Sequence, residues 1–178
     1  MLLIVLIIGA SMFNVALLDE KVARNQRDRL IALHAAELAL ADAELDIENS
    51  AATGSRSAIF SAQSATGFIE NCAKGDDNPF QGLCIRSGPS DVWIKADLAD
   101  SGANSASVRY GRFTGKTMPG ATGPLASQPP RYIIELMMDN TPGQTTDARY
   151  LYRITSIGFG TDERSQVVLQ SFYRKAAK

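Results

Sequence analysis

The sequence contains one histidine and two cysteines among its 178 residues. The histidine, His34, lies in a run of Ala and Leu, where a partly exposed position on a helix is a more ordinary role than general-base catalysis. Two cysteines are too few for a tetrahedral zinc site. Neither a G-x-S-x-G nucleophile motif nor a G-x-x-x-x-G-K-[ST] phosphate loop occurs. We therefore expect no enzyme active site, no cofactor and no metal.

Charge, glycine and proline are distributed very unevenly along the chain. Eighteen basic and nineteen acidic residues nearly cancel, which argues against a nucleic-acid partner. Residues 1–18 carry no charge, and residues 10–53 contain neither Gly nor Pro. Residues 19–50 have four basic and eight acidic side chains, whereas residues 51–178 have fourteen and eleven. These differences divide the chain into an apolar segment (1–18), an amphipathic helix (19–50) and a globular part (51–178), and the opposite charges either attract each other or are simply solvated.

The first segment, MLLIVLIIGASMFNVALL, has only Ser11 and Asn14 as polar residues. A helix needs roughly 20 apolar residues to cross the hydrocarbon core of a bilayer. The segment lacks the basic start of a cleavable signal peptide and continues into further helix-forming sequence. A buried core helix is the alternative, but a retained membrane anchor is the prediction.

The helix-forming pattern continues to about residue 49. Its apolar side chains predict one stripe that a sheet covers. The alternating acidic run predicts a solvated surface rather than a metal site. A continuous helix of 1.5 Å per residue would be roughly 73 Å long, so part of it must project from the globular part. The predicted stripe is Leu30, Leu33, Leu38, Ala41 and Leu45, and the acidic run is Asp42, Glu44, Asp46 and Glu48.

Residues 55–90 are expected to form a loop with a short helix near residues 57–70. Cys72 and Cys84 lie twelve positions apart in this loop. A catalytic thiol would lack a nearby base, and the economical interpretation in an extracytoplasmic protein is one disulfide bond. The neighbouring Asp76-Asp77-Asn78 run lacks the spacing of an EF-hand calcium loop.

The second half of the chain contains the strand patterns. Residues 91–98 alternate strictly between apolar and polar, and residues 107–115 form a weaker candidate strand. Stronger strands are expected in residues 131–139, 148–160 and 165–175, the last two joined by a hairpin loop at 160–164. Alternation in the final strand predicts an antiparallel sheet with one packed and one wet face, and the wrapped helix makes the fold class α+β.

Several runs resemble a known family. IIGASMFNVALLDEKVARNQRDRLIALHAAELALADAE resembles the N-terminal helix of PilX-type minor pilins of type IV pili. QPPRYIIEL, YRITSIGFG and VVLQSFYRK are similar to the C-terminal strands of that family, and GLC resembles the second cysteine of its loop. The resemblance implies a type IV pilin-like fold, in which a long N-terminal helix packs on an antiparallel sheet with a disulfide-closed loop.

The resemblance also implies a function and a location. Minor pilins with this pattern act in the complex that initiates pilus assembly at the fibre tip, and thereby in adhesion and twitching motility. The implied partners are other minor pilins, the major pilin and a large tip adhesin. The implied location is a single pass of the inner membrane with the head in the periplasm, and then the extracellular pilus. The membrane and subunit-packing residues would be Leu2, Leu3, Ile4, Leu6, Ile7, Phe13, Leu17 and Leu18.

One position departs from the pilin pattern. Mature pilins carry glutamate at the fifth position, where this sequence has Val5. We expect the codons upstream of Met1 to encode further apolar residues, that glutamate and a short basic leader ending in Gly. Two alternatives remain from the sequence, a pseudopilin of a type II secretion system and a membrane-anchored periplasmic domain of another function, such as an enzyme.

Overall fold

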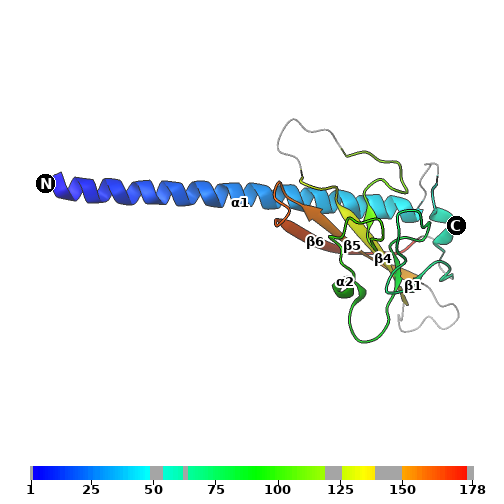
Figure 1. Cartoon of the computed structure of the whole chain (residues 1–178). Helices are drawn as coiled ribbons and strands as arrows, with labels where there is room; N and C mark the ends of the chain where they lie inside the picture. Colours follow the sequence, from blue (N-terminus) through cyan, green and yellow to red (C-terminus); the bar gives the residue numbers. More distant parts are fainter. Residues whose placement is uncertain (1, 49–53, 62–63, 119–125, 139–149, 176–178) are drawn as a thin grey trace.

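The computed structural model describes residues 2–48, 54–61, 64–118, 126–138 and 150–175, with side chains from Leu18 onward. Helix α1 runs without interruption from Leu2 to Glu48. Its second half lies against a sheet, and its first half extends far beyond the head (Figure 1). The absence of Pro throughout the helix, and of Gly beyond Gly9, explains why nothing breaks it.

One sheet of six strands forms the head. Its order is β1-β2-β4-β5-β6, with β3 paired to β4 beside β2. The β3–β4, β4–β5 and β5–β6 pairs are antiparallel, whereas β1–β2 and β2–β4 are parallel. The prediction of a long helix on a mostly antiparallel sheet is confirmed. The strands are β1 (Ile69–Glu70), β2 (Leu83–Ile85), β3 (Val108–Arg109), β4 (Arg131–Met138), β5 (Tyr150–Phe159) and β6 (Gln166–Tyr173), and two short helices are η1 (Ser57–Ile59) and α2 (Val92–Lys95).

The stripe of α1 that faces the sheet differs from the predicted one. Leu30 and Leu45 are exposed, and the buried face consists mainly of alanines. The reason is the close approach of α1 to β5, because a Cβ on Gly158 would overlap the Ala32 carbonyl oxygen and the Ala36 amide nitrogen. Only small side chains fit between two backbones at that separation. The buried face is Ala32, Ala35, Ala36, Ala39, Asp42, Ala43, Asp46 and Ile47.

Residues 91–98 are not a strand, and this prediction is wrong. Val92–Lys95 forms helix α2, and the segment lies across the face of the sheet opposite α1. Val92 and Leu98 pack there, beside the disulfide, against side chains of β4 and β5. The outer face of the central strands is therefore covered rather than wet. A short apolar alternation fits either a strand or a covering segment, and only the packing distinguishes them.

The weaker candidate strand, residues 107–115, is shorter than expected. Only Val108 and Arg109 pair with β4. Gly111 then adopts a φ of 78°, and a Cβ there would overlap the Lys116 carbonyl oxygen. The chain consequently turns at Gly111 and returns toward α1 instead of continuing in the sheet.

Candidate functional site

The projecting part of α1 exposes three large apolar side chains among its described residues. Leu18, Val22 and Leu30 are 60, 52 and 52 % exposed. Leu18 and Val22, four residues apart, lie on successive turns of one side of the helix, and Leu30 lies about two turns further along. In the part of the chain that the structure describes, no helix is both long and apolar enough to span a bilayer.

Asp28 connects the projecting part of α1 to the head. Its carboxylate accepts hydrogen bonds from the amide and the hydroxyl of Thr161, in the β5–β6 hairpin. Hydrogen bonds from the hydroxyls of Ser165 and Thr161 lower the pKa of Asp28, although burial opposes this. The hairpin therefore holds α1 at the point where the helix leaves the sheet.

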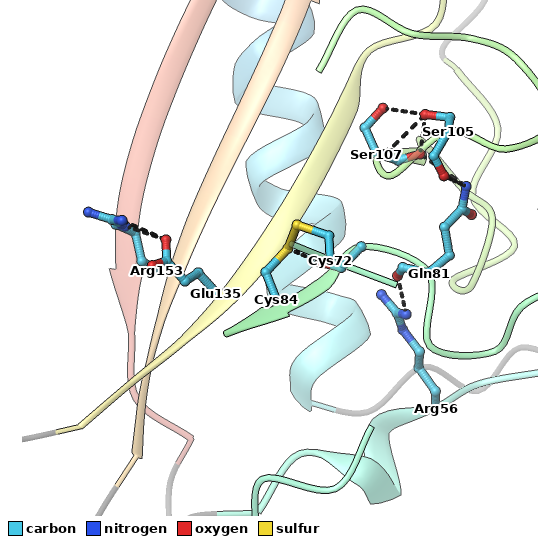
Figure 2. The surroundings of a disulfide bond; sticks show 9 residues. Arg56, Cys72, Gln81, Cys84, Ser105, Ser107, Glu135 and Arg153 are labelled. Carbon is cyan, nitrogen blue, oxygen red and sulfur yellow. Dashed lines mark hydrogen bonds and ion pairs between the residues drawn. A yellow bond between two sulfur atoms is a disulfide. The ribbon is translucent and has the colours of Figure 1, made fainter. Parts of the chain in front are cut away.

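The loop between Cys72 and Cys84 is closed by a disulfide, as predicted, with an S–S distance of 2.04 Å (Figure 2). Within the loop, the amide of Ala73 donates to the Leu83 carbonyl, and the amide of Gly82 donates to the Ala73 carbonyl. Both cysteines are buried against the outer face of β4 and β5. The disulfide thereby ties Cys72 to the middle of β2 and to the layer that covers the sheet.

A buried ion pair lies where α1 ends inside the head. The Arg56 guanidinium contacts the Asp46 carboxylate at 2.7 Å, and both side chains are almost fully buried. Arg56 also donates to the Gln81 carbonyl at 2.6 Å, within the disulfide-closed loop (Figure 2). The Tyr132 hydroxyl donates to Asp46 at 3.0 Å, and burial raises the pKa of Tyr132 well above its usual value. One ion pair thus joins the helix, the loop and the sheet.

Asp42 lies one helical turn before Asp46 and is also buried. It accepts hydrogen bonds from the Gly111 amide at 2.7 Å and from the Thr114 hydroxyl. Burial raises the pKa of Asp42, and these two hydrogen bonds oppose the rise. The prediction of a solvated acidic surface is therefore wrong for Asp42 and Asp46. The sequence pattern that could have predicted their burial is the i, i+4 spacing of Asp42 and Asp46, which places both on the same side of the helix as Ala39 and Ala43.

The described residues show no group of side chains arranged for catalysis or metal binding. The side chain of His34 is largely exposed, and its Nδ1 lies 3.1 Å from Glu37. The described residues contain no group of three or more His, Cys, Asp or Glu side chains that could hold a metal ion. Tyr132 and Tyr152 are part of the core between α1 and the sheet, whereas the Tyr173 hydroxyl donates to Glu48. The polar side chains described above hold the fold together.

The long projecting helix, the sheet that covers its second half and the disulfide-closed loop make this a pilin-like α+β fold. Residues 70–175 match the family model described as type IV pilus assembly protein PilX C-term, and residues 1–41 match the model described as PilX N-terminal. The chain belongs to the PilX family of type IV pilus assembly proteins. This is a family of structural pilins, not of enzymes, and it is associated with the pilus and the membrane. No curated protein and no solved structure matches the chain.

Proposed function

We propose that the chain is a minor pilin of the complex that initiates type IV pilus assembly, and that it acts at the fibre tip. The observation that carries this proposal is the asymmetry of α1. Its second half is held in the head by the sheet and the Asp46–Arg56 ion pair, while its first half has no covering element among the described residues. Exposed apolar side chains such as Leu18 and Val22 are available for contact with another apolar surface.

The three parts of the chain would then have separate roles. Residues 1–18, and above all Leu2–Leu18, lie in the inner membrane before assembly and pack against helices of neighbouring subunits in the fibre. Residues 19–50 continue the helix into the head, and residues 51–178 form the head in the periplasm. The partners are other minor pilins, the major pilin and a large tip adhesin, and the protein reaches the outside with the fibre. Adhesion and twitching motility follow from assembly, and the chain itself has no turnover.

Deletion of the gene tests this proposal. We expect surface pili to fall to a small fraction of the normal number and twitching zones to disappear, while expression of the intact gene from a plasmid restores both. Electron microscopy and sheared-pilin immunoblots measure the number of pili. Loss of protein secretion with normal piliation would instead favour a type II secretion pseudopilin. Unchanged piliation and secretion would contradict both assignments.

A substitution separates assembly from folding. Replacement of Leu18 and Val22 by Ser changes exposed side chains only, so the head should fold normally and the disulfide should form. We nevertheless expect fewer pili, because the apolar contact with neighbouring helices is weakened. Replacement of Asp19 by Ser, on the same part of the helix, is the matched control and should leave piliation unchanged.

A further inference from the structure

Strand β6 forms a free edge of the sheet. In the described structure it pairs with β5 alone, from Gln166 to Tyr173. In an antiparallel pair every second residue directs its amide and carbonyl away from its partner strand. No described residue outside β5 forms a backbone–backbone hydrogen bond with these eight residues. The edge therefore offers a row of donors and acceptors spaced for another strand.

The composition of β6 does nothing to prevent such pairing. Natural edge strands are usually short, or carry Pro, inward-pointing charge or Lys. Residues 166–173, QVVLQSFY, contain no charge and no Pro, and they extend over eight residues. The opposite edge of the sheet differs, because β1 has only Ile69 and Glu70 and is followed by Asn71 and Cys72 at positive φ. Of the two edges that the described strands form, only the β6 edge is long and regular enough to receive a strand.

The side chains beside this edge are apolar on the outer face. Val168 and Phe172 are 42 and 59 % exposed, and both belong to the face opposite α1. They lie four residues apart, opposite Ile157 and Arg153 of β5. Cross-strand pairs between aromatic or β-branched side chains stabilise neighbouring strands. A strand that is added here would cover both side chains as well as the free backbone groups.

A second copy of the chain is a poor occupant. Two β6 edges that pair antiparallel are related by a two-fold axis perpendicular to the sheet. Because α1 lies along one face of the sheet, such an axis would make the two long helices antiparallel (Figure 1). Subunits anchored by their N-terminal helices in one membrane, or packed in one fibre, require parallel helices. This argument rests on the proposed function.

We propose that the β6 edge binds an extended segment of a different protein of the pilus, which adds to the sheet as a strand antiparallel to β6. The segment is uncharged over about six residues, lacks Pro, and has β-branched or aromatic side chains at alternate positions that meet Val168 and Phe172. Backbone hydrogen bonds hold the segment, and the alternate side chains select it. Arg164 and Arg174, on either side of the uncharged stretch, limit the length of the pairing.

A peptide with the sequence of residues 165–174, SQVVLQSFYR, is a suitable probe, because its alternate apolar residues can oppose Val168 and Phe172 while it carries no helix. Binding of the fluorescently labelled peptide to the full chain in detergent is measured by anisotropy. The matched control peptide has the same sequence with alternate backbone nitrogens methylated, which removes donors without changing side chains. We expect saturable binding of the first peptide and at least about tenfold weaker binding of the second.

Variants of the chain locate the site. The double variant Val168→Lys/Phe172→Lys changes two exposed side chains, and we expect it to weaken binding at least about tenfold. Ile69→Lys, an exposed position on the opposite edge, should leave binding unchanged. An unchanged disulfide and unchanged melting temperature verify that each variant folds.

Three results would overturn the inference. The first is no binding of the unmethylated peptide to the folded chain, and the second is binding that neither methylation nor the β6 double variant weakens. The third is a dimer of the chain in light scattering that the β6 double variant abolishes, because the occupant would then be a second copy. The peptide assay does not depend on piliation, so failure of the proposed minor-pilin function would appear in the gene deletion alone.

Discussion

The two halves of α1 have the same backbone structure and opposite relations to the rest of the molecule. From residue 32 onward, mainly small side chains and two buried carboxylates face the sheet, and the large apolar side chain of Leu45 is exposed. Before residue 31 the described side chains are nearly all exposed. The comparison shows that apolar size does not decide which side chains of a helix are buried. The separation of the two packed backbones decides it, and Gly158 sets that separation.

The two halves of α1 should differ most in how much their ion pairs contribute to the free energy of unfolding. Asp46→Asn should lower the free energy of unfolding by about 3–5 kcal/mol, because it leaves the Arg56 charge buried without a carboxylate. Glu20→Gln, which removes the exposed partner of Arg24 in the projecting half, should cost less than about 0.5 kcal/mol. Urea unfolding of the two variants measures both values. Similar losses in the two variants would contradict the distinction.

The disulfide lies in the head, which holds the second half of α1. Cys72→Ser/Cys84→Ser should lower the free energy of unfolding by about 3 kcal/mol, because the closed loop spans a separation of 12 residues and limits the unfolded chain. Urea unfolding of the double variant tests this value. Intact mass with and without reductant should show no free thiols in the native protein. Two free thiols in the folded chain would contradict the assignment of the bond.

Two glycines of β5 and its hairpin test the close approach directly. Gly158→Ala should cost about 1–3 kcal/mol, because the new methyl group meets backbone atoms of α1. Gly160→Ala is the matched control. The atoms nearest to its methyl group would be those of the Asp28 side chain, which can move, so the cost should be smaller. Calorimetric melting temperatures rank the two variants, and an equal or greater loss for Gly160→Ala would contradict the explanation of the alanine stripe.

A smaller effect concerns the pH dependence contributed by Asp42. Burial raises the pKa of Asp42 in the folded protein above its value in the unfolded chain. The folded state therefore carries a penalty for the ionised carboxylate at pH 7, and this penalty is relieved as the pH falls through the raised pKa. Asp42→Asn lacks this dependence. We expect the unfolding free energy of the original protein to rise relative to that of Asp42→Asn when the pH is lowered from 7 to 5.

Urea unfolding of both proteins at the two pH values measures this difference. Carboxylates with a lowered pKa, such as Asp28, have the opposite sign, but they contribute equally to both proteins and cancel. Asp77→Asn, which changes an exposed carboxylate near the same loop, is the control and should show no such trend. A relative rise in the stability of Asp42→Asn at lower pH would contradict the prediction.

The smallest effect is expected in the projecting half. Val22→Ser/Leu30→Ser should change the melting temperature of the head by less than about 2 °C, because neither side chain contacts the core and surface substitutions usually stay within about 0.5 kcal/mol. Calorimetry of the full chain in detergent measures it. A large loss would show that the projecting half contributes to the core of the head, and would remove the difference between the two halves.

The features of the fold that the sequence predicts correctly are those that depend on residues close together in the chain. The long helix, the three main strands, the hairpin and the disulfide partners followed from the sequence, since helix propensity, strand alternation and cysteine number act over short distances. The alanine stripe, the buried Asp42 and Asp46, and helix α2 in place of a strand did not. Each depends on an element distant in sequence. The alanine stripe depends on β5, the buried carboxylates on the segments at Arg56 and Gly111, and helix α2 on the outer face of the sheet.

Local sequence patterns were therefore sufficient to predict an uninterrupted helix with an apolar start, joined to a sheet with one disulfide, and the family that the chain resembles. The packing of the helix on the sheet sets which side of the helix is buried, that two carboxylates lie inside the head, and that β6 pairs on one side only among the described residues. The physical reason is that backbone separation and strand order are properties of the assembled layers. A carboxylate remains buried only where a distant guanidinium or amide is brought to it, and an edge exists only once every other strand has its place.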